Sequence, residues 1–215
     1  MYKLIAFDFD GTLADSVEFC LAVYKQVFEK FMGENAPSRE EVFQNFGMNE
    51  PGIIKLFMGK PCPEAEQYFY KLHREQHGEW CPEPFEGAVE LLEFLKAKQL
   101  TLTIITGRAE ATCQISMDFL NLGKFFSHFQ TGSPERNDKT AQLLALLERY
   151  NLKKDEIAYV GDAVSDAEAC IRAGVDCLSA AWAKTAHIEE LEKLNPGKVF
   201  RTVKSMQEYI ASRIG

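Results

Sequence analysis

The sequence lacks the features that are typical of proteins that bind nucleic acids or membranes. It has no run of lysine and arginine, and 24 basic against 32 acidic residues give a net charge of −8 and a pI near 5.1. A chain of this charge repels nucleic-acid phosphates and anionic membrane surfaces. It also has no apolar stretch of the ~20 residues that a membrane span needs. We therefore expect no nucleic-acid and no membrane partner, and nothing in these patterns indicates an oligomeric state.

Paired cysteines are missing as well. None of the six cysteines belongs to a Cys-x-x-Cys pair, so neither a zinc knuckle nor a thioredoxin-type site is supported. There is no Asn-x-Ser/Thr acceptor, and the apolar run of residues 4–7, which stops at Asp8, is too short for the core of a signal peptide. We expect reduced, buried thiols and a cytoplasmic protein.

What is present is an ordinary globular composition, with 46% hydrophobic and 26% charged residues. Short apolar runs alternate with segments of helical periodicity, which predicts βαβ units and hence an α/β fold whose parallel sheet has helices on both faces. The expected strands are residues 4–7, 101–105, 128–131, 157–160 and 177–181. The expected helices between the later strands include residues 88–98, 141–150 and 166–173.

One long segment breaks this alternation. From Ser16 to about Trp80 the sequence has only helical periodicity, beginning with an amphipathic helix that Asp15 or Ser16 would cap. We interpret residues 15–82 as an all-helical module inserted into an α/β core made of residues 1–14 and 83–215.

Two pairs of aspartates follow predicted strands. Asp8 and Asp10 come directly after the first strand, and Asp162 and Asp166 follow the strand at 157–160 with helical i,i+4 spacing. Ligands of open α/β folds lie beyond the carboxyl ends of the strands. Four carboxylates there are costly without a cation, and oxygen ligands favour a hard ion such as Mg²⁺.

Two further segments can hold an anion. Thr106 and Gly107 end the strand at 101–105 and offer a hydroxyl and an unhindered backbone N–H. Lys139 opens a predicted helix, where a positive charge opposes the helix dipole and therefore suggests a role elsewhere. A carboxylate nucleophile, a second acid, a hydroxyl, a lysine and a metal are the components of phosphoryl transfer through an aspartyl-phosphate.

Taken in order, these motifs resemble those of the haloacid dehalogenase superfamily. The residues that carry the resemblance are Asp8-Phe9-Asp10-Gly11-Thr12-Leu13, Thr106, Lys139 and Gly161-Asp162-x-x-x-Asp166. The helical module after the first motif resembles the superfamily's cap, and the chain is most similar to the branch of phosphoglycolate phosphatase and β-phosphoglucomutase. The resemblance covers essentially the whole chain.

The resemblance implies a Rossmann-like parallel sheet with strand order 5-4-1-2-3. It makes Asp8 the nucleophile and a metal ligand, and Asp10 the general acid and base with its carbonyl on Mg²⁺. Thr106 and Lys139 become phosphate-binding residues, together with the Gly107 amide. Asp162 becomes a metal ligand, and Asp166 ligates directly or through water.

The sequence departs from the family pattern after three motifs. Ala163 stands where a hydroxyl residue is common after the first aspartate of the last motif. Thr140 stands where proline is frequent, which leaves Arg136 as an alternative to Lys139. Arg108 follows the threonine motif, and we weigh a surface ion pair equally against a substrate contact for it.

Two pairs of residues in the helical module need separate interpretation. His73 and His77 have a spacing that could bind a transition metal, but we expect solvated residues of a cap helix. Asn49 and Glu50 lie in a loop between cap helices, where family members place residues that select the substrate.

The leading functional hypothesis is a Mg²⁺-dependent phosphatase of a small phosphorylated metabolite. A sugar phosphomutase is an alternative that would need a cap that excludes water. A non-catalytic phosphate sensor is a third hypothesis, which would predict a lost nucleophile, although Asp8 is present. Dehalogenation is disfavoured, because family members that perform it lack an acid equivalent to Asp10.

Overall fold

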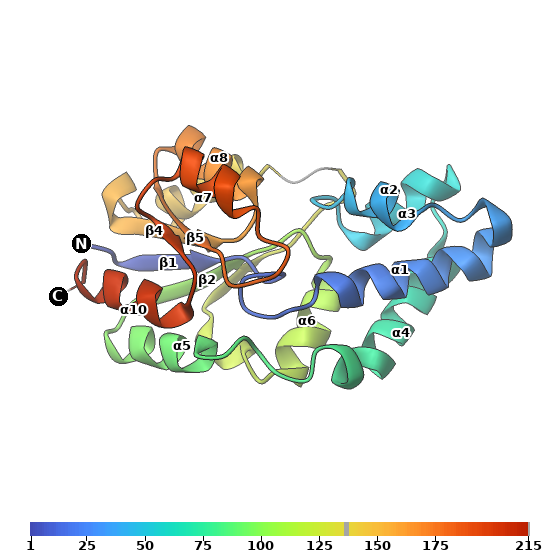
Figure 1. The fold of residues 1–215 in the computed structure, drawn as a ribbon, viewed down its shortest axis with the longest axis horizontal. Helices are drawn as coiled ribbons and strands as arrows, with labels where there is room; N and C mark the ends of the chain where they lie inside the picture. The colour runs from blue at the N-terminus through green and yellow to red at the C-terminus, as the bar shows by residue number, and fades with distance from the viewer. Residues whose placement is uncertain (136–137, 215) are drawn as a thin grey trace.

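A computed structural model describes residues 1–135 and 138–214 of the chain. A twisted parallel sheet of six strands lies at its centre, in the order β3-β2-β1-β4-β5-β6 (Figure 1). The strands are β1 (Leu4–Phe7), β2 (Thr101–Ile105), β3 (His128–Gln130), β4 (Ile157–Gly161), β5 (Asp176–Ala180) and β6 (Val199–Phe200). Taken from β5 to β3, the order is the expected 5-4-1-2-3, and β6 extends the sheet beyond β5.

Ten α-helices and three short 3₁₀ turns connect these strands in the described ranges. The helices are α1 (Val17–Met32), α2 (Arg39–Phe43), α3 (Glu50–Met58), α4 (Pro63–Trp80), α5 (Ala88–Ala97), α6 (Glu110–Phe119), α7 (Lys139–Arg149), α8 (Val164–Ala173), α9 (Ile188–Leu194) and α10 (Val203–Ala211). The 3₁₀ turns are η1 (Gly33–Asn35), η2 (Gly123–Phe125) and η3 (Lys154–Glu156).

The sheet is buried on both faces because its central strands are apolar throughout. Side chains of a strand alternate between faces, so Leu4 and Ala6 of β1 join one core with α7, α8 and α9. Ile5 and Phe7 join the other core with α5, α6 and α10. Burial on both faces is the expected state of an all-parallel sheet.

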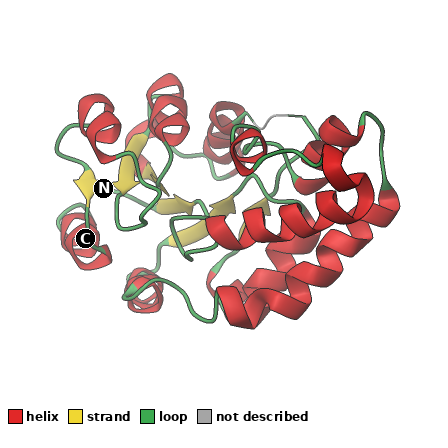
Figure 2. Cartoon of the chain, turned by 45° about the vertical axis from the view of Figure 1, so that its right-hand side comes forward, coloured by secondary structure: helices red, strands yellow, loops and turns green. Residues whose placement is uncertain are grey.

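The helices α1 to α4 lie together beyond the carboxyl end of the sheet, to the right in Figure 1 and as a red cluster at the right of Figure 2. The aromatic residues of this cluster pack on each other, as Tyr24 does on Phe69 with ring centroids 4.6 Å apart. The cluster also packs on the sheet domain through α4 and α6. Its position puts a helical wall opposite the strand ends.

Local sequence explains where several helices begin and end. Ser38 and Glu41 form a capping box at the start of α2, and Asn49 accepts a hydrogen bond from the Gly52 amide at the start of α3. Gly174 ends α8 in the left-handed region. Ser16 is the residue before α1, but its hydroxyl does not cap the helix and bonds Asp10 instead.

No helix in the described part of the chain is long and apolar enough to cross a membrane. All six cysteines are free thiols, and five of them are buried, which confirms the expectation of small buried hydrophobes.

Candidate functional site

A pocket of about 410 Å³ lies where the carboxyl ends of β1, β2 and β4 face the helices α1 to α3. Its floor on the sheet side contains both predicted aspartate motifs and the glycine of the β2 motif. The floor residues that matter below are Asp8, Asp10, Gly107, Arg108, Lys139 and Asp162. Open α/β sheets bind ligands at this edge.

Three of the predicted metal ligands meet at this floor: Asp8 and Asp162 line the pocket, and Asp166 is fully buried next to them. Asp8, Asp162 and Asp166 each offer a carboxylate oxygen, and these oxygens lie within 4.8 Å of one another. Burial and the neighbouring carboxylates raise the pKa of Asp8 to about 7 and that of Asp162 well above its usual value. The cluster therefore holds more negative charge than its surroundings stabilise.

Lys139 neutralises part of this charge. Its Nζ donates to Asp8 Oδ2 at 2.7 Å, to Asp166 Oδ1 at 2.5 Å and to the hydroxyl of Tyr159 at 2.9 Å. Burial opposes its charge, but the carboxylates of Asp166 and Asp8 raise the pKa of Lys139. The predicted first-turn lysine of α7 thus reaches out of its helix into the cluster. Arg136, the alternative to Lys139, lies outside the described residues.

The charge that remains fits a divalent cation. When all four groups are ionised, three carboxylates and one ammonium leave a net charge of −2. Three carboxylate oxygens close to one another, two from buried residues and one from the partly buried Asp162, match the hard oxygen donors that Mg²⁺ prefers. Asp8, Asp162 and Asp166 are therefore the residues that could hold such an ion.

The loop after β1 is shaped around Asp162. Gly11 has a φ of +71°, and a Cβ there would lie 2.2 Å from Asp162 Oδ2, so only glycine fits. The next residue, Thr12, donates its hydroxyl to Asp162 Oδ1 at 3.4 Å, and its carbonyl accepts a bond from Trp182 Nε1 at 3.1 Å. This turn brings the Asp8 motif and the Asp162 motif into contact.

The predicted phosphate-binding residues of β2 lie at the same edge. Thr106 is fully buried, and its hydroxyl accepts a bond from the Arg108 amide at 3.3 Å. Gly107 lines the pocket and approaches the loop of the helical cluster, since a Cβ on it would lie 3.6 Å from the Cα of Gly47. Their contact with phosphate stays a prediction.

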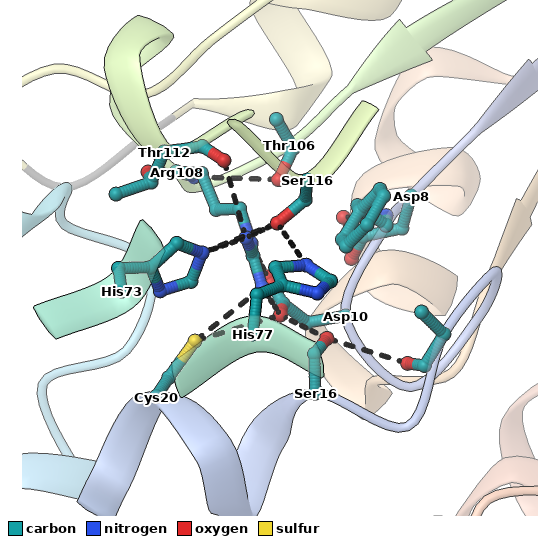
Figure 3. Close-up of polar contacts among 12 residues, drawn as sticks. Asp8, Asp10, Ser16, Cys20, His73, His77, Thr106, Arg108, Thr112 and Ser116 are labelled. Atoms are coloured by element: carbon teal, nitrogen blue, oxygen red, sulfur yellow. Dashed lines mark hydrogen bonds and ion pairs between the residues drawn. The ribbon is translucent and has the colours of Figure 1, made fainter. Parts of the chain in front are cut away.

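The side chain of Asp10 lies outside the carboxylate cluster, in a separate, partly buried ion pair with Arg108 (Figure 3). Arg108 donates from Nε and Nη2 to the two Asp10 oxygens at 2.8 and 2.7 Å, and Ser16 donates its hydroxyl at 2.6 Å. Burial alone would raise the pKa of Asp10, but the charge of Arg108 and these hydrogen bonds lower it. Coordination of a metal by the Asp10 carbonyl stays a prediction.

Arg108 is neither at the surface nor unpaired. It is 4% exposed, and its guanidinium carbon lies 4.5 Å from the centre of the Phe9 ring. The surface ion pair weighed for this residue is therefore wrong, because Arg108 is buried and its partner Asp10 is a partly buried residue of the pocket floor. Its remaining donors contact Ser116 Oγ at 2.7 Å and Cys20 Sγ at 3.4 Å.

The expectation that His73 and His77 are solvated is wrong. Both rings are fully buried, with Nε2 atoms 3.1 and 2.9 Å from Ser116 Oγ, between α4 and α6 (Figure 3). Burial and the nearby Arg108 charge lower the pKa of His77 to about 4 and that of His73 well below its usual value. The two neutral rings are part of the packing against Phe19.

Asn49 and Glu50 join the helical cluster to the sheet domain. Asn49 caps α3 and donates to the Gly132 carbonyl at 3.0 Å. The buried Glu50 carboxylate accepts from the Ala109 amide at 2.6 Å and from the Thr112 hydroxyl at 2.5 Å. Glu50 also lines the pocket. Substrate selection by these two residues stays a prediction.

Sequence reasoning missed Tyr159, Ser16 and Ser116 as parts of the site. Tyr159 is a fully buried β4 residue whose hydroxyl receives the Lys139 bond. A buried tyrosine in an apolar strand needs a hydrogen-bond partner for its hydroxyl, and this requirement could have identified Tyr159 as a residue with a polar contact. Ser16 bonds Asp10, six residues away, but the sequence analysis considered it only as a helix cap. Ser116 bonds His73 and His77, which lie 43 and 39 residues away, and no local pattern signals such a contact.

Comparisons with known proteins agree on one family. The sequence pattern of the haloacid dehalogenase-like hydrolases matches residues 5–180. Phosphoglycolate phosphatase 1 of Pseudomonas aeruginosa is 26% identical over 187 residues, covering 81% of this chain and 68% of that protein. Pyrophosphatase PpaX of Bacillus velezensis is 27% identical over 183 residues, covering 83% and 82%.

Solved structures share the fold. A Clostridium acetobutylicum protein described as a predicted phosphatase superposes with a TM-score of 0.77 at 18% identity, covering 99% of both chains. A haloacid dehalogenase-like hydrolase of Streptococcus pneumoniae gives a TM-score of 0.71 at 22% identity, covering 97% of this chain and 98% of that one.

Proposed function

Because the chain belongs to the haloacid dehalogenase-like hydrolases, we propose that it hydrolyses a small phosphomonoester, with Asp8 as the nucleophile and Mg²⁺ as the cofactor. The observation that carries the proposal is the cluster of Asp8, Asp162, Asp166 and Lys139 at the carboxyl ends of β1 and β4. Phosphatases of the same family among the relatives support it.

In the first step, an Asp8 oxygen attacks phosphorus in line with the ester oxygen, and the bond from phosphorus to that oxygen breaks. Asp10 donates a proton to the departing alkoxide, so that an alcohol leaves and an aspartyl-phosphate remains. Arg108 stabilises the Asp10 anion left behind, since it already holds that carboxylate through two hydrogen bonds.

In the second step, a water molecule attacks the phosphorus of the aspartyl-phosphate. Asp10 accepts the proton of that water, and the bond from phosphorus to the Asp8 oxygen breaks, releasing phosphate and restoring both carboxyl groups. Lys139 and the Thr106-Gly107 segment would hold the phosphoryl oxygens during both steps. A Mg²⁺ ion held by Asp8, Asp162 and Asp166 would supply positive charge to the transferring group.

We also propose that residues 15–82 form a cap domain over a core of residues 1–14 and 83–215. The helices α1 to α4 supply the wall of the pocket opposite the carboxylates. A cap at this place would exclude bulk water and strengthen the electrostatic contacts to the phosphoryl group.

The test is phosphate release from a panel of phosphorylated metabolites, measured with Mg²⁺ and with EDTA. We expect turnover only with Mg²⁺, and Asp8→Asn should lower it by at least about a thousandfold, because a covalent step is lost. The matched control is Asp15→Asn, at an exposed position in the same loop. Equal losses in both variants, or full activity in EDTA, would contradict the proposal, and strict dependence on an added sugar bisphosphate would indicate a mutase.

A further inference from the structure

The wall of the pocket that faces the carboxylates is apolar. Helices α1, α2 and α3 and the loop before α3 contribute the side chains of Val17, Tyr24, Phe43, Phe46, Met48 and Ile53. Phe43, Phe46 and Met48 are partly exposed, so they have surface left for a ligand. With the phosphoryl group at Asp8, the rest of a substrate in this pocket would contact these side chains.

The same wall offers no positive charge among its described residues. Its one charged side chain is Glu50, and both of its oxygens accept hydrogen bonds from the start of α6. An anionic substituent on the substrate would therefore meet an acid and aromatic rings. Transfer of an unpaired carboxylate into such surroundings costs several kcal/mol.

The basic side chains of the described pocket lining already have acidic partners. His187, which precedes α9 in the sheet domain, has Glu190 Oε1 3.6 Å from its Nδ1. Lys139 lies in the carboxylate cluster, where the phosphoryl group is expected. The five N–H groups of Arg108 face the Asp10 carboxylate, Ser116, Cys20 and the Thr112 carbonyl. No donor of Arg108 remains for a second anionic group of a substrate.

From this lining we infer that the substrate is a phosphomonoester of an uncharged, largely apolar alcohol, such as one with an aromatic ring. The inference rests on the proposed phosphatase function and narrows its substrate class. The names of two relatives contain phosphoglycolate and pyrophosphate, each of which carries a second anionic group beside the phosphoryl group that is cleaved. The inference excludes both molecules as preferred substrates of this protein. The pocket volume of about 410 Å³ is in the range of small-ligand sites.

The test compares kcat/KM for benzyl phosphate, 2-phosphoglycolate and inorganic pyrophosphate on the Mg²⁺-loaded enzyme. Benzyl phosphate and 2-phosphoglycolate both release an alkyl alcohol, so their difference reports on recognition and not on an activated leaving group. We expect benzyl phosphate to be favoured by about 100-fold or more, as burial of an unpaired carboxylate would predict. An equal or higher kcat/KM for phosphoglycolate or pyrophosphate would overturn the inference and leave the proposed function intact. Absence of phosphate release from all three, on a folded Mg²⁺-loaded enzyme, would overturn the proposed function itself.

A charge placed in the wall gives a second test. Phe46→Arg should narrow the preference for benzyl phosphate over 2-phosphoglycolate by about 10-fold, because the guanidinium can pair with the carboxylate. Met48→Arg serves the same purpose if the first variant does not fold. Phe31→Arg is the matched control, since Phe31 is an exposed residue of α1 outside the pocket lining. An unchanged preference in both pocket variants would contradict an apolar subsite at this wall.

Discussion

At the scale of single residues, Asp8 and Asp10 are two positions apart in the sequence but have opposite electrostatic surroundings. Burial and Asp166 raise the pKa of Asp8, whereas Arg108 holds that of Asp10 below its usual value. A cation held by Asp8, Asp162 and Asp166 would lower the pKa of Asp8 and favour the ionised carboxylate that attack on phosphorus needs. The spacing of the two aspartates predicts their shared location, but Arg108 is 98 residues from Asp10 in the sequence, so no local pattern predicts their ion pair.

The buried histidine His77 predicts a pH dependence of stability. Its pKa is about 4 in the folded protein and near 6.5 when unfolded, so the unfolded chain binds the proton more readily. The stabilisation from a neutral His77 is complete above pH 6.5 and is lost as the pH falls toward 4. His77→Gln should remove this contribution, which amounts to up to about 2 kcal/mol between pH 6.5 and 5.

Urea unfolding of both proteins at pH 7.5 and pH 5 measures this difference. The variant should lose less unfolding free energy than the wild type when the pH is lowered. The same loss in both proteins would mean that His77 is already protonated in the folded state at pH 5.

At the scale of elements, apolar runs predict the central strands β1, β2 and β4 to within one residue. The sequence analysis did not predict α6, although this helix packs on α4 and its buried face belongs to the same hydrophobic core as the sheet residues Ile5 and Phe7. That face includes Thr112 and Ser116, whose hydroxyls bond Glu50 and the two histidines. Polar residues paired across an interface hide the hydrophobic period, because their partners come from another helix. The solvated interpretation of the histidines failed for the same reason.

The start of α6 should depend on Glu50. In Glu50→Ala, both accepting oxygens are removed, so the Ala109 amide and the Thr112 hydroxyl each lose a hydrogen bond. We expect a loss of about 1–3 kcal/mol in the free energy of unfolding, measured in urea. The control is Glu64→Ala, at an exposed site in the first turn of α4, which should change stability by no more than about 0.5 kcal/mol. Equal effects of the two substitutions would contradict a role of Glu50 at this junction.

At the scale of the whole molecule, the order of the strands brings distant motifs together. β1 lies between β2 and β4, so the residues after all three strands meet at one edge. The alternation of strands and helices predicts this arrangement, since parallel strands of a βαβ fold end on the same side. The two-residue strand β6 is too short for a sequence pattern to reveal it. The sequence also does not predict that Arg108 pairs with Asp10 and Lys139 with Asp8, because these long side chains contact residues that are far from them in the sequence.

The excess charge at that edge predicts that Mg²⁺ stabilises the whole fold. Binding at 100 times the dissociation constant should add about 2.7 kcal/mol to the free energy of unfolding, because the ion relieves repulsion among buried carboxylates. For a chain of this size that is a rise in Tm of about 5–10 °C. Calorimetry with Mg²⁺ and with EDTA measures the rise, and Asp162→Asn should reduce it. A Tm that is the same in both buffers would contradict a metal site at these residues.

The hydrogen bond from Trp182 to the Thr12 carbonyl gives the protein an optical reporter. The chain has two tryptophans, and the other, Trp80, ends α4 with 45% of its surface exposed. Fluorescence from Trp182 therefore comes from a ring that is bonded to the turn at Gly11-Thr12, next to Asp10 and Asp162. Trp80 emits from the solvent-exposed end of α4. In Trp80→Phe, the remaining fluorescence would come from Trp182 alone and would report on the environment of the Gly11-Thr12 turn without an attached dye.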